Sequence, residues 1–126
     1  MSIARTEPCV LLVEDDESLR TMLVVLLTRL GIEVDVADSF ASAREYLDKF
    51  AITGLITDYQ LGDGKGTTLA EIALQRNPYA KLALVSGSTP EIPKNLAGRI
   101  TILEKPFSPE ELRIFLEDFP RAERPA

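Results

Sequence analysis

The run Ile56-Thr57-Asp58-Tyr59-Gln60-Leu61 ends an apolar segment in a carboxylate, and the rest of the chain is best understood from it. Residues 52–56 are typical of a short strand that is buried on both faces. Residues 62–66 include three glycines, so we expect irregular backbone there. A charged group at the carboxyl end of a buried strand lies where open parallel sheets bind their ligands. Asp58 is therefore the first candidate for a functional residue.

Composition narrows the classes of function. The chain has 126 residues, 45% of them hydrophobic, which suits one domain with a single core. Its net charge of −6 argues against direct binding of nucleic acid or of anionic membranes. No apolar run reaches the length of a membrane span and no signal-peptide pattern begins the chain, so a cytoplasmic location is expected.

Two residue types are nearly or wholly missing. Histidine is absent and Cys9 is the single cysteine. These counts exclude a histidine-based triad, a zinc site and a histidine phosphodonor within the chain. Cys9 lies in an apolar run and is expected to be a buried packing residue.

Five strand patterns alternate with helical patterns along the chain. The strands are expected at residues 9–13, 32–37, 52–56, 80–85 and 99–103. Helices are expected after the caps Asp16 and Ser39, after the glycine-rich loop, and after the capping box that starts at Ser108. Between the last two strands, Pro90 and Pro93 predict a short or irregular fourth helix. This alternation predicts a doubly wound α/β fold with a five-stranded parallel sheet and helices on both faces.

The apolar periodicity of the helical patterns assigns inward-facing residues. In the first helix these are Leu19, Met22, Leu23, Leu26, Leu27 and Leu30, with Gly31 as the stop. In the later helices they are Phe40, Ala43, Leu47 and Phe50, then Leu69, Ile72 and Ala73, and finally Leu112, Phe115 and Leu116. The last helix is expected to stop at Pro120.

Polar residues follow four of the predicted strands and should meet at one edge of the sheet. Glu14 and Asp15 follow the first strand, Asp58 the third, Ser86 the fourth and Lys105 the fifth. Three carboxylates repel one another at close range, by about 4 kcal/mol per pair near a surface, unless a cation lies among them. Hard oxygen ligands favour Mg²⁺ over zinc. A carboxylate, Mg²⁺, a lysine and a hydroxyl are the groups needed for phosphoryl transfer to an aspartate.

Each of these residues also has an ordinary structural explanation. An acidic run before a helix commonly caps it, although Asp16 alone is enough for that purpose. A lone aspartate after a strand is more often a turn residue, a serine there is a turn hydroxyl, and most lysines are solvated. The case for a site depends on all of them falling on one edge of the sheet.

Four motifs resemble the receiver domain of bacterial two-component response regulators. They are Leu11-Leu12-Val13-Glu14-Asp15-Asp16, Ile56-Thr57-Asp58, Leu84-Val85-Ser86-Gly87 and Leu103-Glu104-Lys105-Pro106-Phe107. The resemblance covers residues 8–119 and implies a flavodoxin-like receiver fold. Residues 1–7 are then an N-terminal extension and residues 120–126 a C-terminal tail that we expect to be frayed.

The resemblance implies a role for each residue of the site. Asp58 would be phosphorylated by a sensor histidine kinase or a histidine phosphotransfer protein. Mg²⁺ would be held by Asp15, Asp58, the main-chain carbonyl of Gln60 and, through water, Glu14. Ser86, Gly87 and Lys105 would contact the phosphoryl group, and Gln60 and Ser88 would tune its hydrolysis. The Lys105–Pro106 peptide bond is expected to be cis.

Several positions differ from the family's usual pattern. Ile102 stands where an aromatic switch residue is usual, so the output through Ile102 and Pro106 is in question. Gly62 stands where proline is common and Lys65 where an acid is common, so the loop after Asp58 is expected to be more mobile than usual.

Other functions stay open at this point. A phosphatase with an aspartyl-phosphate intermediate would carry a second acid where Gln60 stands. The chain can also be a pseudo-receiver that binds a partner without being phosphorylated, or a receiver module taken from a larger hybrid kinase or regulator. We expect no effector domain after residue 120, and no turnover of a separate substrate beyond the chain's own phosphorylation and dephosphorylation.

Overall fold

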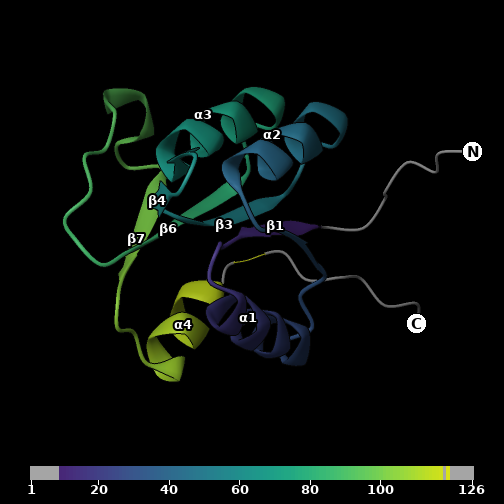
Figure 1. Cartoon of the computed structure of the whole chain (residues 1–126), viewed down its shortest axis with the longest axis vertical. Coiled ribbons are helices and arrows are strands. Elements are labelled where there is room, and N and C mark those ends of the chain that lie inside the picture. The colour runs from purple at the N-terminus through teal and green to yellow at the C-terminus, as the bar shows by residue number, and fades with distance from the viewer. Residues whose placement is uncertain (1–8, 118, 120–126) are drawn as a thin grey trace, which may run out of the picture.

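The central element is a five-stranded sheet in which all neighbouring strands run parallel. This computed structural model describes residues 9–117 and 119, and its strand order is β2-β1-β3-β6-β7 (Figure 1). The strands are β1 (Val10–Val13), β2 (Val34–Ala37), β3 (Gly54–Asp58), β6 (Lys81–Ser86) and β7 (Ile100–Glu104). The predicted parallel sheet is confirmed, with every strand within two residues of its expected bounds.

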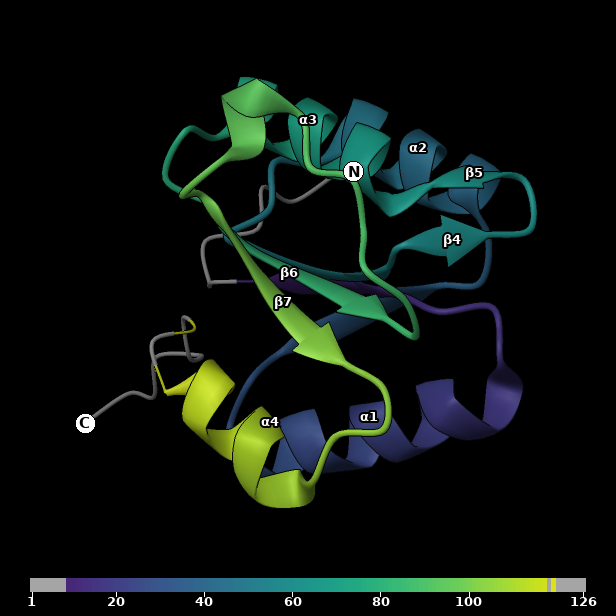
Figure 2. The same ribbon diagram turned by 90° about the vertical axis from the view of Figure 1, so that its left-hand side faces the viewer.

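Helices cover both faces of the sheet, as a doubly wound fold requires. Figures 1 and 2 show α2 (Phe40–Lys49) and α3 (Gly66–Arg76) on one face, and α1 (Glu17–Arg29) and α4 (Pro109–Leu116) on the other. Each face has its own apolar cluster, one around Leu55 and Leu69 and the other around Ile56 and Leu27. Adjacent residues of β3 therefore belong to opposite layers, as the two-residue period of a strand dictates.

The first helix has its predicted ends but a narrower buried stripe. Ser18 and Leu19 donate their N–H groups to the Asp16 carboxylate, and Gly31 follows the helix with a φ of 79°. Leu23 and Leu27 are buried, one helical turn apart, whereas Met22 is 45% exposed. The inward placement of Met22 was wrong because this helix contacts the sheet along one i, i+4 row, and Met22 lies on its flank.

Helices α2 and α4 keep their predicted caps and end earlier than predicted. Ser39 caps α2 in a capping box with Ser42, and Ser108 caps α4 in a capping box with Glu111. Phe50 lies just beyond α2 as its C-cap and is 36% exposed, so its assignment to the inward face was wrong. The last helix ends at Leu116 rather than at Pro120, which lies outside the described residues.

The glycine-rich loop after Asp58 forms regular structure, contrary to the sequence expectation. Residues Gln60–Leu61 (β4) and Gly64–Lys65 (β5) pair as a short antiparallel hairpin (Figure 2). At its tip, the Asp63 carboxylate accepts the N–H groups of Phe40 and Ala41, 2.8 and 3.0 Å away, at the first turn of α2. These two bonds lower the pKa of Asp63. The hairpin is thus anchored to α2, a contact that the expectation of a mobile loop did not include.

The connection between β6 and β7 contains a single 3₁₀ turn, Lys94–Leu96 (η1), in place of a full helix. Leu96 is fully buried and joins the cluster under α2 and α3. The prediction of a short or irregular fourth helix, made from Pro90 and Pro93, is confirmed.

Three further expectations concern Cys9, the ends of the chain and membrane-spanning helices. Cys9 is buried, with its Sγ 3.4 Å from the Tyr46 hydroxyl, as expected of a packing residue. The proposed extension 1–7 and tail 120–126 lie outside the described residues. Among residues 9–117 and 119, no helix has the length and apolarity needed to cross a membrane.

Gly66 provides a test of how closely β3 and α3 are packed. A Cβ at this position would come within 2.2 Å of the Asp58 carbonyl oxygen, whereas a Cβ at Gly62 would meet no atom within 4 Å. Gly66→Ala is therefore expected to lower the free energy of unfolding by about 1–3 kcal/mol, and Gly62→Ala to change it by about 0.5 kcal/mol or less. Urea unfolding of both variants measures this, and equal midpoints would contradict the close packing.

Candidate functional site

The strand register brings the acidic residues to one level at the edge of the sheet formed by the carboxyl ends of its strands. Val13 of β1 pairs with Thr57 of β3. The residues that follow them, Glu14 and Asp58, therefore lie side by side at the carboxyl ends of two central strands. Ser86 and Lys105 come next to this point because β3, β6 and β7 continue the same parallel order.

The first acidic segment is fixed by hydrogen bonds to its backbone. Glu14 is 1% exposed, and its N–H donates to the carbonyl of Ala37 at 3.1 Å. Its own carbonyl accepts from the Arg20 guanidinium at 2.9 Å, and its carboxylate accepts the N–H of Asp16 at 3.1 Å. Asp15, between them, is exposed. One buried and one exposed carboxylate thus follow β1, and the buried one has little freedom to turn away.

Asp58 is the last residue of β3 and is 9% exposed. The next residue, Tyr59, donates its N–H to Val85 and accepts the N–H of Gly66, both at 2.8 Å. The hydroxyl of Thr57 donates to the Asp58 carbonyl at 3.0 Å. The backbone on both sides of the Asp58 side chain is therefore held in place, which fixes the direction in which its carboxylate points.

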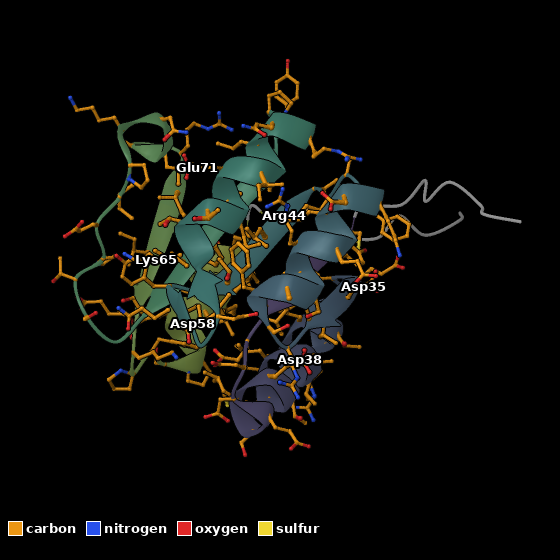
Figure 3. All side chains as sticks on the ribbon, turned by 45° about the horizontal axis from the view of Figure 1, so that its top comes forward. Asp35, Asp38, Arg44, Asp58, Lys65 and Glu71 are labelled. Atoms are coloured by element: carbon orange, nitrogen blue, oxygen red, sulfur yellow. The ribbon has the colours of Figure 1, made fainter. Side chains whose placement is uncertain are left out.

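Three carboxylates and one ammonium group meet at this edge. Oxygens of Glu14, Asp15 and Asp58 all lie within 4.8 Å of one another. The Lys105 Nζ lies 3.4 Å from Asp58 Oδ2 and 3.8 Å from Glu14 Oε1. The Lys105–Pro106 peptide bond is cis, as the resemblance to receiver domains implied. Figure 3 shows Asp58 to the lower left of the centre of the molecule in that view, just below Lys65 of the hairpin.

The ionised form of this cluster is electrostatically unfavourable. Burial is the largest cause that raises the pKa of Asp58, Lys105 opposes it, and the charge of Asp15 adds to it. Burial likewise raises the pKa of Glu14; the N–H of Asp16 lowers it, and the charge of Asp58 raises it further. One lysine therefore does not compensate three acids. Clustered carboxylate oxygens with this excess of negative charge are a donor set that fits Mg²⁺.

Ser86 is buried beside the cluster but is engaged by its own loop. Its hydroxyl donates to the Ser88 carbonyl and accepts the Ser88 N–H at 3.1 Å. A pocket of about 310 Å³ opens here, and Gln60, Gly87 and Lys105 contribute to its lining with Asp58, Ser86 and Ser88. A larger pocket of about 460 Å³ at the opposite edge of the sheet has no carboxylate in its described lining, so it offers no comparable chemistry.

The two predicted output residues lie outside this pocket. Ile102 is on β7 with 40% of its surface exposed, and Pro106 follows Lys105 beyond the strand. The structure thus gathers the predicted residues Glu14, Asp15, Asp58, Ser86, Gly87, Ser88, Lys105 and Gln60 at one edge.

Sequence reasoning missed two residues that support the site. The Arg20 guanidinium donates a hydrogen bond to the carbonyl of Glu14. Tyr59, directly after β3, accepts the Glu91 N–H with its hydroxyl at 3.1 Å. A polar aromatic residue directly after the acidic one was the available signal for Tyr59. Nothing in the sequence pattern indicated its partner 32 residues away.

Comparison with known proteins agrees with this geometry. A family model for the response regulator receiver domain matches residues 10–117. The response regulator receiver protein CpdR of Brucella abortus is 33% identical over 106 residues, which cover 82% of this chain and 88% of CpdR. The response regulator protein PilR of Pseudomonas aeruginosa is 31% identical over 106 residues, 82% of this chain but 24% of PilR. The chain therefore spans about a quarter of that longer relative.

A solved structure shows the same fold. The response regulator receiver protein from Sinorhizobium medicae superposes with a TM-score of 0.74 at 28% identity, covering 87% of this chain and 91% of that one. The family model spans every residue of the acidic cluster and its lysine. The chain belongs to the response regulator receiver domain family of two-component systems.

Proposed function

We propose that Asp58 accepts a phosphoryl group from a phosphohistidine on a sensor histidine kinase or a histidine phosphotransfer protein, with Mg²⁺ bound, and that this modification switches contacts with a protein partner. The observation that carries the proposal is the position of the Asp58 carboxylate. Asp58 lines an open pocket, and its Oδ2 lies 3.4 Å from the Lys105 Nζ. Glu14 and Asp15 lie beside it. Family membership supports it, since receiver domains act as signalling modules.

Mg²⁺ fits the donor set of this edge. Asp15, Asp58 and the main-chain carbonyl of Gln60 would hold the ion directly, and Glu14 would act through water. When bound, the ion supplies positive charge that lets an anionic phosphoryl group approach three carboxylates. The remaining chemistry belongs to the chain's own residues.

The transfer is a displacement at phosphorus. An oxygen of Asp58 forms the new bond to phosphorus while the bond between phosphorus and the donor's imidazole nitrogen breaks, and the imidazole keeps the electron pair. The Lys105 ammonium pairs with a phosphoryl oxygen, and Gly87, which lines the same pocket, offers its N–H to another. Ser86 contributes its hydroxyl after it turns away from the Ser88 carbonyl.

Lifetime and output follow from the residues around the acceptor. Gln60 and Ser88 flank the pocket where water must approach, so we assign to them the tuning of hydrolysis. Ile102 lies on β7, which leads to Lys105, and Pro106 follows the lysine, so we assign to these two residues the first response to a movement of Lys105. On this assignment the chain turns over no substrate other than its own phosphoryl group.

A second candidate concerns the protein in which this domain acts. The alignment with PilR covers 24% of that regulator. This share favours a role for the domain as the receiver module of a larger regulator or hybrid kinase. The chemistry at Asp58 is the same in either case.

Phosphorylation can be tested with a small phosphodonor. Incubation with acetyl phosphate and Mg²⁺ is expected to add one phosphoryl group per chain, measured by intact mass, because Asp58 lies in an open pocket beside Lys105. Asp58→Asn is expected to abolish the added mass, and a chelator to prevent it.

The matched control is Asp38→Asn. It removes an exposed carboxylate outside the acidic cluster of Glu14, Asp15 and Asp58, and is expected to leave the labelling intact. Labelling that survives in Asp58→Asn, or none in the wild type, would overturn the proposal.

The crowding of carboxylates predicts a stability effect without metal. At pH 7 in chelator, Asp58→Asn is expected to be more stable than the wild type by about 1–4 kcal/mol, because it removes a charge that is buried and repelled by Asp15, effects that the Lys105 pair offsets only in part. The pKa values of Glu14 and Asp58 are raised above their ordinary 4.5 and 3.8, so the folded chain binds protons more tightly than the unfolded one. Wild-type stability therefore falls as pH rises above this range.

Urea unfolding at several pH values measures this effect. The advantage of Asp58→Asn should shrink as the pH is lowered from 7 toward the ordinary carboxylate range. Asp48→Asn, on the exposed face of α2, is the control and should show no such trend. An advantage that grows on acidification would contradict the account of the electrostatics.

A further inference from the structure

The segment that follows β6 has an unusual attachment to the rest of the molecule. Residues 87–93 run without regular secondary structure from Ser86 to the 3₁₀ turn. Within the described chain, the hydrogen bonds of residues 87–92 are the local pair between Ser86 and Ser88 and one tertiary bond, from the Glu91 N–H to the Tyr59 hydroxyl at 3.1 Å. A single side chain therefore ties the polar backbone of this loop to the sheet.

Tyr59 is well placed to hold that bond. It directly follows Asp58, and its main chain bonds to Val85 and Gly66 at 2.8 Å on both sides. Its side chain is 6% exposed, and the ammonium of Lys65 lies 5.9 Å from its ring. A phenylalanine could fill the same apolar space, so the hydroxyl is the group that needs explanation. It accepts the Glu91 N–H, which has no other hydrogen-bond partner within residues 9–117 and 119.

The loop held by Tyr59 is a wall of the pocket over Asp58. Gly87 and Ser88 line that pocket. Glu91 follows only three residues later, and Pro90 lies between. Proline fixes its own φ and restricts Thr89 before it, so the connection from Ser88 to Glu91 is stiff. Holding the Glu91 N–H therefore limits how far Gly87 and Ser88 can move away from Asp58.

We propose that Tyr59 is a positioning residue that holds the Gly87–Glu91 loop against the Asp58 pocket and so sets the lifetime of a phosphoryl group there. The inference depends on the proposed function. Hydrolysis requires a water oxygen to bond to phosphorus while the bond from phosphorus to the Asp58 oxygen breaks, which returns the carboxylate and releases inorganic phosphate. A loop that stays closed restricts the approach of that water.

The chain offers a minimal variant for this test. Tyr59→Phe removes the hydroxyl alone and leaves the ring in its buried place. Amide exchange of Ser88, Thr89 and Glu91 in the unmodified protein is expected to accelerate about fivefold, the effect of losing one hydrogen bond of ordinary net strength. Exchange in β1 and β3 is expected to stay at the wild-type rate.

The same variant carries the functional measurement. After labelling with acetyl phosphate and Mg²⁺ and removal of the donor, Tyr59→Phe is expected to lose its phosphoryl group about fivefold faster than the wild type, followed by intact mass. Tyr79→Phe makes the identical change at a tyrosine that is 90% exposed and should match the wild type. Glu91→Ala keeps the N–H donor and should keep the wild-type exchange.

The outcomes separate this inference from the function on which it depends. A wild-type chain that takes up no label overturns the proposed function. A labelled wild type whose lifetime and loop exchange match those of Tyr59→Phe overturns the role of Tyr59 and leaves the phosphorylation standing. Acceleration of exchange in β1 and β3 by the same factor as in the loop also overturns it, because it would mean that Tyr59 acts only on global stability.

Discussion

The burial of Glu14 and Asp58 beside a third carboxylate, Asp15, is the constraint on which the rest of this structure depends. Strand register places Glu14 beside Asp58, and hydrogen bonds to the backbone on both sides prevent either from moving away. Lys105 compensates only part of the charge. The folded chain thus keeps a cluster whose negative charge Lys105 neutralises only in part, and we propose that a divalent cation compensates the rest when a phosphoryl group binds.

Much of this arrangement could be predicted from sequence because it follows from short-range rules. Alternating strand and helix patterns require a parallel sheet, and a parallel sheet brings the residues after each strand together. The two prolines between β6 and β7 were sufficient to predict the lost helix. The hairpin at residues 60–65 could not be predicted, since the glycines suggested irregular backbone and the anchoring of Asp63 by α2 involves residues more than 20 positions apart. The Tyr59–Glu91 contact was missed for the same reason.

The site combines parts that are fixed with parts that can move. Asp58 and its neighbours in the central strands are held by the sheet, so on the proposed function the acceptor carboxylate is in place before any donor arrives. Ser86 bonds to its own loop, and on the proposed function its hydroxyl turns away from Ser88 to reach the phosphoryl group. The loop after β6 is tied to the sheet by the hydrogen bond from the Glu91 N–H to the Tyr59 hydroxyl. Ile102 has no aromatic ring that could change position. We therefore expect the response to a phosphoryl group to begin in the loop after β6, since Gly87 and Ser88 of this loop line the pocket over Asp58.

The identity of the acceptor residue is the central claim, and borohydride trapping tests it most directly. Reduction of the acetyl phosphate-treated protein converts an acyl phosphate on aspartate to homoserine, which peptide mass spectrometry can locate. The account predicts homoserine at position 58 and aspartate at position 15 in the same sample. Homoserine at Asp15 or elsewhere with an unmodified Asp58 would contradict it.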